Sequence, residues 1–295
     1  RLVGSEMCIR DRPKDEKDED RKRREEDEQK PLNTMRALWR RSKSEIKEEE
    51  YTEFYKHITH DYDAPLRTIH YSAEGQLEFK ALLFIAGKPG YDLFMPNRKH
   101  GLQLYVRNVF IGSDFEELLP DYLRFVQGVV DSSDLPLNVS REMLQDDAVI
   151  RKMRSSLVGK ILSDLEAFKK DNIEGYLDFF RGFGRVLKEG LHSDYEHADK
   201  LKELVMFPSD KTEEGKLTTL RAYKDAMAEG QKEIYYLVAE SVENAKNSPQ
   251  LEAFRKRDID VLFFADPVDE WILDAMGEYD GTKLRAIDKL SLIHI

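Results

Sequence analysis

The chain has 295 residues, which suggests about two domains at roughly 150 residues each. Its 58 acidic and 47 basic residues give a formal net charge of −11, and this balance argues against nucleic acid as the default partner. No apolar run approaches the ~18 residues of a membrane-spanning helix, and Cys8, the single cysteine, cannot form an intrachain disulfide.

Charge dominates the N-terminal region. Lys14–Lys30 contains 16 charged residues out of 17, of both signs, and such a segment buries too little apolar surface to offset its ordering entropy. We therefore expect residues 1–34 to form a disordered charged linker. Arg1–Arg12 and the tail 290–295 look non-native and are left out of the fold prediction.

Residues 35–190 are predicted to form the larger of two α/β/α subdomains. A helix is expected from Glu48, because Tyr51, Phe54 and Tyr55 share one face. Apolar, β-branched runs bounded by turn residues indicate strands, and an apolar stripe at helical spacing indicates a long helix. The strands are expected at Leu77–Ile85, Leu102–Ile111 and Leu123–Val130, and the long helix at about Asp147–Lys170.

Residues 191–230 are expected to form a helical connector, and residues 231–289 a smaller α/β subdomain. Strands and helices alternate in this last part, which is typical of a small, mostly parallel sheet covered by helices. The predicted fold class is therefore α/β, with a larger α/β/α domain, a helical connector and a smaller α/β/α domain. The expected strands are Ile234–Val238, Ile259–Ala265 and Lys283–Ile287, and the expected helices are Tyr195–Leu204, Leu217–Ala228, Pro249–Lys256 and Val268–Glu278.

The segment Asp131–Gln145, DSSDLPLNVSREMLQ, places Arg141 in a short connection between a predicted strand and the long helix. A rigid scaffold presents functional side chains from such connections. The forked, permanently charged guanidinium suits phosphate oxygens in a bidentate contact. From spacing alone, however, a lone arginine here is more often a surface residue or an ion-pair partner.

An apolar stripe at helical spacing marks the C-terminal region, at positions 268, 271, 272, 275 and 276. The pattern alone favours a core position for Trp271. Asp266 and Asp269 follow a predicted strand, where the ligands of open α/β sheets bind. An independent small-molecule-binding enzyme domain is therefore an alternative interpretation, although no Walker A, GxGxxG, HExxH or GxSxG signature occurs.

Seven ordered blocks, in a match that covers roughly Leu38 to Lys289, resemble the middle domain of the Hsp90 chaperones, most closely their bacterial members. The resemblance implies an ATP-driven, dimeric protein-folding machine. The amino-terminal ATP-binding domain and the carboxy-terminal dimerisation domain are expected outside this chain. The blocks are Ala37–Ile46, Glu49–Leu66, Glu74–Ile85, His100–Ile111, Leu119–Gln145, Glu233–Ser241 and Asp266–Ile272.

The resemblance implies a catalytic role for Arg141, which would reach the γ-phosphate of ATP held by the amino-terminal domain. Gln145 would support the closed arrangement of the two domains, and Asn138 and Ser140 would cap the short helix and direct Arg141. ATP and Mg belong to the full-length protein, so we expect no cofactor, no metal and no ATP hydrolysis in this chain alone.

The resemblance also implies a surface that binds unfolded or partly folded client proteins, at Glu270 and Trp271. Asp274 stands where relatives can carry asparagine, which puts the polar part of that surface in doubt. Trp39 and Tyr91 are weaker candidates for exposed client contacts. The expected partners are clients and the two missing domains, without nucleic acid or membrane, and the chain is expected to be monomeric and cytoplasmic.

Overall fold

The computed structural model describes residues 37–75, 77–95, 101–113, 115, 117–136 and 148–289. The charged segment Lys14–Lys30 and both ends lie outside them. The chain divides into two compact units, Arg1–Arg41 and Ser42–Ile295. The described part of the first unit contains one 3₁₀ helix, η2 (Leu38–Arg40).

The second unit contains a mixed five-stranded sheet with the strand order β1-β2-β5-β3-β4. Strand β5 lies at its centre, antiparallel to β2 and parallel to β3, while the pairs β1–β2 and β3–β4 are antiparallel. The connection that follows β5 therefore starts from the middle of the sheet. The strands are β1 (Arg67–Ala73), β2 (Phe79–Ile85), β3 (Gly101–Val106), β4 (Val109–Ser113) and β5 (Val126–Ser132).

The structure corrects one predicted strand of this sheet. Leu102–Ile111 is not a single strand but the hairpin of β3 and β4. Arg107 and Asn108 form its turn with φ values of 51° and 69°. Two positive φ values are the backbone conformation of a type I′ turn, and no glycine or proline marks it in this sequence. Strand β1 was not predicted.

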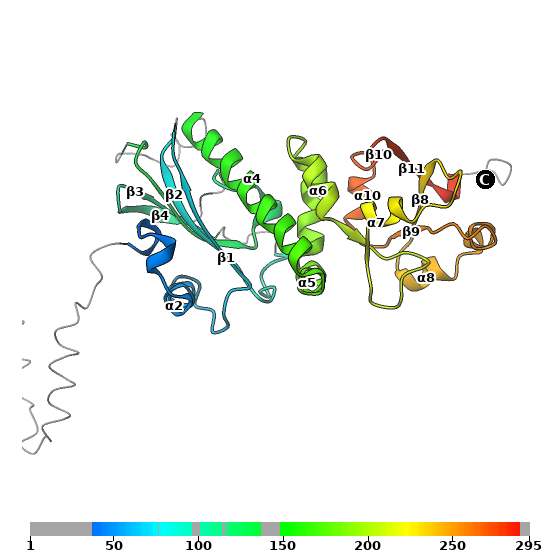
Figure 1. Cartoon of the computed structure of the whole chain (residues 1–295), viewed down its shortest axis with the longest axis horizontal. Coiled ribbons are helices and arrows are strands. Elements are labelled where there is room, and N and C mark those ends of the chain that lie inside the picture. The colour runs from blue at the N-terminus through cyan, green and yellow to red at the C-terminus, as the bar shows by residue number, and fades with distance from the viewer. Residues whose placement is uncertain are drawn as a thin grey trace, which may run out of the picture. The chain divides into compact units, whose positions relative to one another are not determined.

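Helices cover both faces of the sheet. On β2, Leu83 belongs to the large core cluster that includes the helices α4 (Ala148–Asp171) and α5 (Ile173–Ser193). The next residue, Phe84, contacts Tyr55 of α2, with ring centroids 5.3 Å apart. Because successive strand residues point to opposite faces, α2 (Glu48–Thr59) lies on the face opposite α4. In Figure 1, α4 crosses the sheet, and these layers confirm the predicted α/β/α arrangement.

In the predicted connector, residues 191–230, α6 (Ala198–Leu204) precedes a two-stranded ribbon and the short helix α7 (Leu220–Asp225). The ribbon pairs β6 (Met206–Phe207) with β7 (Thr218–Thr219). The Thr219 hydroxyl accepts a hydrogen bond from the Ala222 backbone N–H and caps α7. The predicted helix Leu217–Ala228 is therefore shorter, since Thr218 and Thr219 belong to the ribbon and the helix ends at Asp225.

The second sheet has the order β10-β11-β8-β9. Its pairs β11–β8 and β8–β9 are parallel and β10–β11 is antiparallel, which confirms the mostly parallel prediction. No helix among the described residues is long and apolar enough to cross a membrane. The strands are β8 (Glu233–Val238), β9 (Leu262–Phe264), β10 (Glu278–Tyr279) and β11 (Thr282–Ala286), and the helices α8 (Val242–Lys246), α9 (Glu252–Arg255) and α10 (Asp269–Ile272).

Candidate functional site

The predicted catalytic residues lie in the connection between β5 and α4. Asn138, Ser140, Arg141 and Gln145 all fall within residues 137–147, which lie outside the described residues. Their proposed roles therefore stay predictions. What the structure does give is the geometry of the two elements that hold this connection.

The N-terminal end of the connection is fixed by polar contacts with Glu78, which precedes β2, and with the β3–β4 turn. The Ser133 N–H donates to the Glu78 carbonyl at 3.2 Å, and the Glu78 N–H donates to Asp134 Oδ2 at 2.7 Å. Arg107 Nε donates to the Ser133 carbonyl at 3.1 Å. Leu135, at 1% exposure, is buried in the core. The chain therefore enters the connection from a well-determined point.

The other end of the connection is α4, a helix of 24 residues. The Arg67 guanidinium donates to both Asp164 carboxylate oxygens, at 3.0 and 3.1 Å, and ties β1 to α4. Tyr71 of β1 and Ser156 of α4 share a hydrogen bond of 3.0 Å between their hydroxyls. A connection between a central strand and an anchored helix is suited to presenting a side chain to another domain.

A cavity of about 570 Å³ lies beside α4 and is lined by Arg151, Arg154 and the Asp194 carboxylate, among others. Asp194 accepts hydrogen bonds from the Tyr122 hydroxyl at 2.6 Å and from the His197 backbone N–H at 3.1 Å. Burial would raise the pKa of Asp194, but hydrogen bonds from Tyr122 and His197 outweigh it and lower that pKa. The carboxylate is thus engaged in fixing the end of α5.

The second predicted site lies on α10 and on the turn after it, where the structure separates the apolar stripe into a buried and an exposed part. Val268, Ile272 and Met276 are 7%, 0% and 1% exposed, whereas Trp271 is 67% exposed. Glu270 and Asp274 are exposed as well. We call Glu270, Trp271 and Asp274 the Trp271 surface. The spacing favoured a core position for Trp271, and this prediction is wrong. Val268, Ile272 and Met276, which are four residues apart, form the buried face, and Trp271 lies outside it.

The two weaker aromatic candidates differ in exposure. Trp39, in η2, is 7% exposed, so the expectation of an exposed tryptophan there is wrong. Removal of so large an apolar ring from water is favourable. Tyr91 is fully exposed, at 103%.

Asp266 and Asp269 engage a buried lysine. Lys188 of α5 is 1% exposed, and its Nζ lies 2.7 Å from Asp266 Oδ2 and 2.8 Å from Asp269 Oδ1. Burial raises the pKa of Asp269, and the Lys188 charge opposes this shift. Asp266 and Asp269 were the candidate ligand-binding residues of the alternative enzyme interpretation, and both carboxylates are engaged in ion pairs with Lys188. Sequence reasoning missed Lys188, which stands in a helix that was not predicted.

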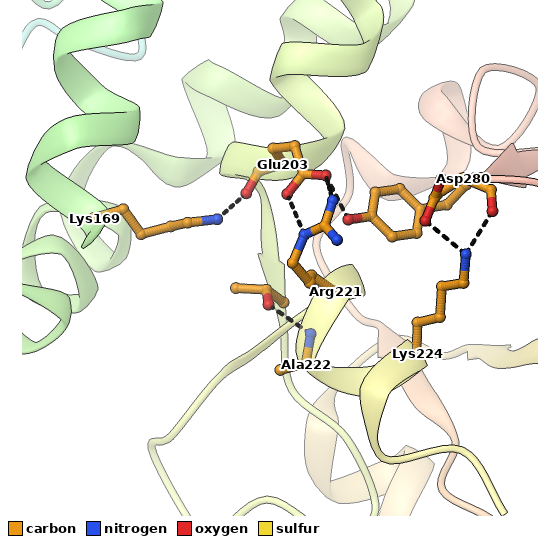
Figure 2. A network of polar contacts seen from close by, with 8 residues as sticks. Lys169, Glu203, Arg221, Ala222, Lys224 and Asp280 are labelled. Atoms are coloured by element: carbon orange, nitrogen blue, oxygen red, sulfur yellow. Dashed lines mark hydrogen bonds and ion pairs between the residues drawn. The ribbon is translucent and has the colours of Figure 1, made fainter.

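A second polar cluster joins the connector to β10, with Glu203 at its centre (Figure 2). Arg221 Nη2 lies 2.7 Å from Glu203 Oε1, and the Tyr279 hydroxyl donates to the same oxygen at 2.5 Å. Lys169 donates to the Glu203 carbonyl. Burial would raise the pKa of Glu203, but hydrogen bonds from Arg221 and Tyr279 outweigh it, so this pKa lies below its usual value.

No group of three or more histidine, cysteine or acidic side chains is arranged to hold a metal ion within the described ranges. The polar clusters around Lys188, Glu203 and Asp194 instead consist of ion pairs and hydrogen bonds between protein groups. These three clusters can fix the positions of the backbone segments that they join.

Comparison with known proteins places these elements in a family. The family model described as Hsp90 protein matches residues 5–293. That match begins within the first twelve residues, so their foreign appearance gains no support from it. The chaperone protein HtpG of Geobacter sulfurreducens is 55% identical over 269 residues, which cover 91% of this chain and 41% of that protein. HtpG of Bdellovibrio bacteriovorus is 47% identical over 262 residues, which cover 89% and 42%.

A solved structure agrees with the sequence comparison. The middle domain of a Plasmodium falciparum putative heat shock protein is similar, with a TM-score of 0.76 and 32% identity, over 86% of this chain and 100% of that one. The chain spans about two fifths of the length of its curated relatives. The chain therefore belongs to the Hsp90 protein family, and its α/β fold is that of the family's middle domain.

Proposed function

We propose that the chain serves as the middle segment of an ATP-dependent molecular chaperone, contributing an arginine to ATP hydrolysis and a surface to client binding. Family membership supports the chaperone role. The nucleotide and Mg would be held mainly by an amino-terminal domain, and dimerisation would need a carboxy-terminal one. The chain alone would bind clients without turning over ATP, and a cytoplasmic location stays a prediction.

The first part of the proposal concerns Arg141. Its guanidinium would contact the γ-phosphate when the two domains close, and would stabilise the charge that develops in phosphoryl transfer. Support comes from the anchoring of both flanking elements, β5 through Glu78 and α4 through Arg67. Gln145 would support the closed arrangement, and Asn138 and Ser140 would direct the arginine.

Steady-state ATPase rates of the full-length protein test this role. Arg141→Ala should lower turnover by about 10³-fold or more, as loss of an arginine finger does, with ATP affinity little changed. Arg141→Lys should restore only part of the rate, because a point charge does not reproduce the bidentate fork. Gln145→Ala should be milder, at about 0.5–1.5 kcal/mol for a neutral hydrogen bond. Near-normal turnover of Arg141→Ala would contradict the proposed role of this arginine in ATP hydrolysis.

The second part concerns the Trp271 surface, and the exposed indole is the observation that carries it. An aromatic side chain at 67% exposure beside the exposed carboxylates of Glu270 and Asp274 offers apolar contact area and charge together. Aromatic anchors contribute much of the binding energy at protein interfaces. Unfolded clients expose apolar side chains that such an anchor can bind.

Titration of the 295-residue chain with a permanently unfolded protein, reduced and carboxymethylated α-lactalbumin, tests this surface. Trp271→Ala should raise the Kd at least about tenfold, as loss of an interface anchor does. Tyr62→Ala is the matched control, because Tyr62 is 92% exposed and lies between α2 and β1. Equal Kd values for Trp271→Ala and the unaltered chain would contradict the proposal.

A further inference from the structure

We propose that Lys188 is a positioning residue for the Trp271 surface, acting through Asp266 and Asp269. The inference rests on the proposed role of that surface in client binding. Lys188 touches none of the surface residues in the contacts described above. Its effect would pass through the backbone of α10, which carries Glu270 and Trp271.

The burial of Lys188 is the first step of the argument. The side chain is 1% exposed, and its Nζ lies 4.5 Å from the centre of the Phe207 ring. A buried ammonium group is tolerated only where carboxylates and a polarisable ring compensate for lost water. Asp266 and Asp269 supply that compensation, at 2.7 and 2.8 Å. Displacement of either carboxylate from Lys188 would be costly.

The second step is the double engagement of Asp269. While Oδ1 pairs with Lys188, Oδ2 accepts the Asp266 N–H at 2.9 Å, and the Asp269 N–H donates to the Asp266 carbonyl at 2.9 Å. These contacts close the turn that starts α10. Glu270 and Trp271 follow directly, so the direction of their side chains is fixed by a cation on another helix.

The third step concerns the C-terminal end of residues 266–280, which lysine side chains also hold. Lys202 donates to the Glu278 carbonyl at 2.8 Å, and Lys224 donates to the Asp280 carboxylate at 2.6 Å. Residues 266–280 are thus bound to α5 at one end and to α6 and α7 at the other. Figure 2 shows the pair of Lys224 and Asp280 at the second end. A surface held at both ends is ordered before a client arrives, which lowers the entropic cost of binding.

A purely structural role for Lys188 is the competing explanation, and a paired substitution separates the two. Lys188→Met alone leaves the Asp269 carboxylate buried without a cation, which should destabilise the fold. Lys188→Met with Asp269→Leu replaces the buried pair by apolar side chains, which often restores stability. Asp266 is left unsubstituted in the double variant, because its side chain is 41% exposed and water can solvate its charge. The double variant still lacks the contacts that orient α10.

The experiment uses the 295-residue chain carrying Trp39→Phe, so that Trp271 is the single tryptophan. Thermal unfolding, the time-resolved anisotropy of Trp271, and titration with carboxymethylated α-lactalbumin are measured for both variants. We expect the single variant to unfold at a lower temperature and the double variant to recover. In both, the rapid component of the Trp271 anisotropy should grow and the client Kd should rise at least about tenfold.

Recovery of client affinity and anisotropy together with stability in the double variant would overturn the proposal, as would unchanged values in both variants. Arg255→Met is the control, since Arg255 pairs with Asp210 and contacts no residue of 266–280 in the hydrogen bonds described. If Trp271→Ala binds clients normally, the proposed client surface fails instead. The anisotropy then still decides whether Lys188 positions α10.

Discussion

The five-stranded sheet with its helices and the segment 266–280 keep their shapes by different means. In the former, Phe125 is 1% exposed, with its ring centroid 5.5 Å from that of Phe179 and 5.2 Å from that of Phe183. The segment adds to its buried side chains a set of ionic contacts, with Lys188 and Glu203 at their centres. Apolar packing responds little to protonation, whereas ionic contacts respond directly. A change of pH should therefore alter the Trp271 surface before it alters the aromatic core around Phe125.

The largest effect should come from truncation within the aromatic core. Phe125→Ala should lower the free energy of unfolding by about 3–5 kcal/mol, because it removes a buried ring and leaves a cavity. Urea denaturation followed by circular dichroism measures this loss. Phe94→Ala is the control, since that side chain is 50% exposed. A loss below about 1 kcal/mol for Phe125→Ala would show that the core relaxes to fill the space.

The next largest effect should depend on pH, through Glu203. Its pKa is lowered in the folded chain, so its stabilising contribution is complete above the unfolded value of about 4.3 and is lost as the pH falls through the folded pKa. Glu203→Gln should therefore lower the unfolding temperature at pH 7, and the difference from the unaltered chain should shrink towards pH 3. A difference independent of pH would show that the carboxylate charge is not what holds β10.

A smaller effect is expected from the Tyr279 hydroxyl, which donates to Glu203 at 2.5 Å. Tyr279→Phe should cost about 1–2 kcal/mol, since hydrogen bonds to charged acceptors exceed neutral ones. Tyr71→Phe is the matched control, because that hydroxyl shares a hydrogen bond with the neutral Ser156. Hydrogen exchange should rise around β10 in the first variant and around β1 in the second. Equal costs would remove the distinction between charged and neutral contacts.

The elements that sequence patterns predicted best are those with a clear apolar period. Helix α2 begins at Glu48 and α4 lies within a residue of its predicted ends, because each buries one continuous stripe. Helix α5 was not predicted because its sequence contains four glycines, at positions 175, 182, 184 and 190. Glycine has low helix propensity. One of its glycines is required by close packing, since a Cβ on Gly190 would lie 2.8 Å from the Tyr122 ring.

The candidate sites were predictable to different degrees. The family motif around Arg141 and the pair Glu270–Trp271 could be found in the sequence, because each is a local string of residues. The Lys188 ion pairs could not, since the lysine and Asp266 are 78 residues apart. Nothing local distinguishes a buried lysine from a solvated one. Only the fold brings α5 beside the turn that starts α10.

The smallest effect expected is the stability change from removing the displayed tryptophan. Trp271→Ala truncates a larger aromatic ring than Phe125→Ala, yet the indole is 67% exposed and the core beneath it is filled by Ile272 and Met276. The free energy of unfolding should therefore stay within about 0.5–1 kcal/mol of the original. Urea denaturation of both variants under one set of conditions makes the comparison. A loss of about 3 kcal/mol or more would place Trp271 in the core, and weakened client binding by that variant would then report unfolding rather than a lost contact.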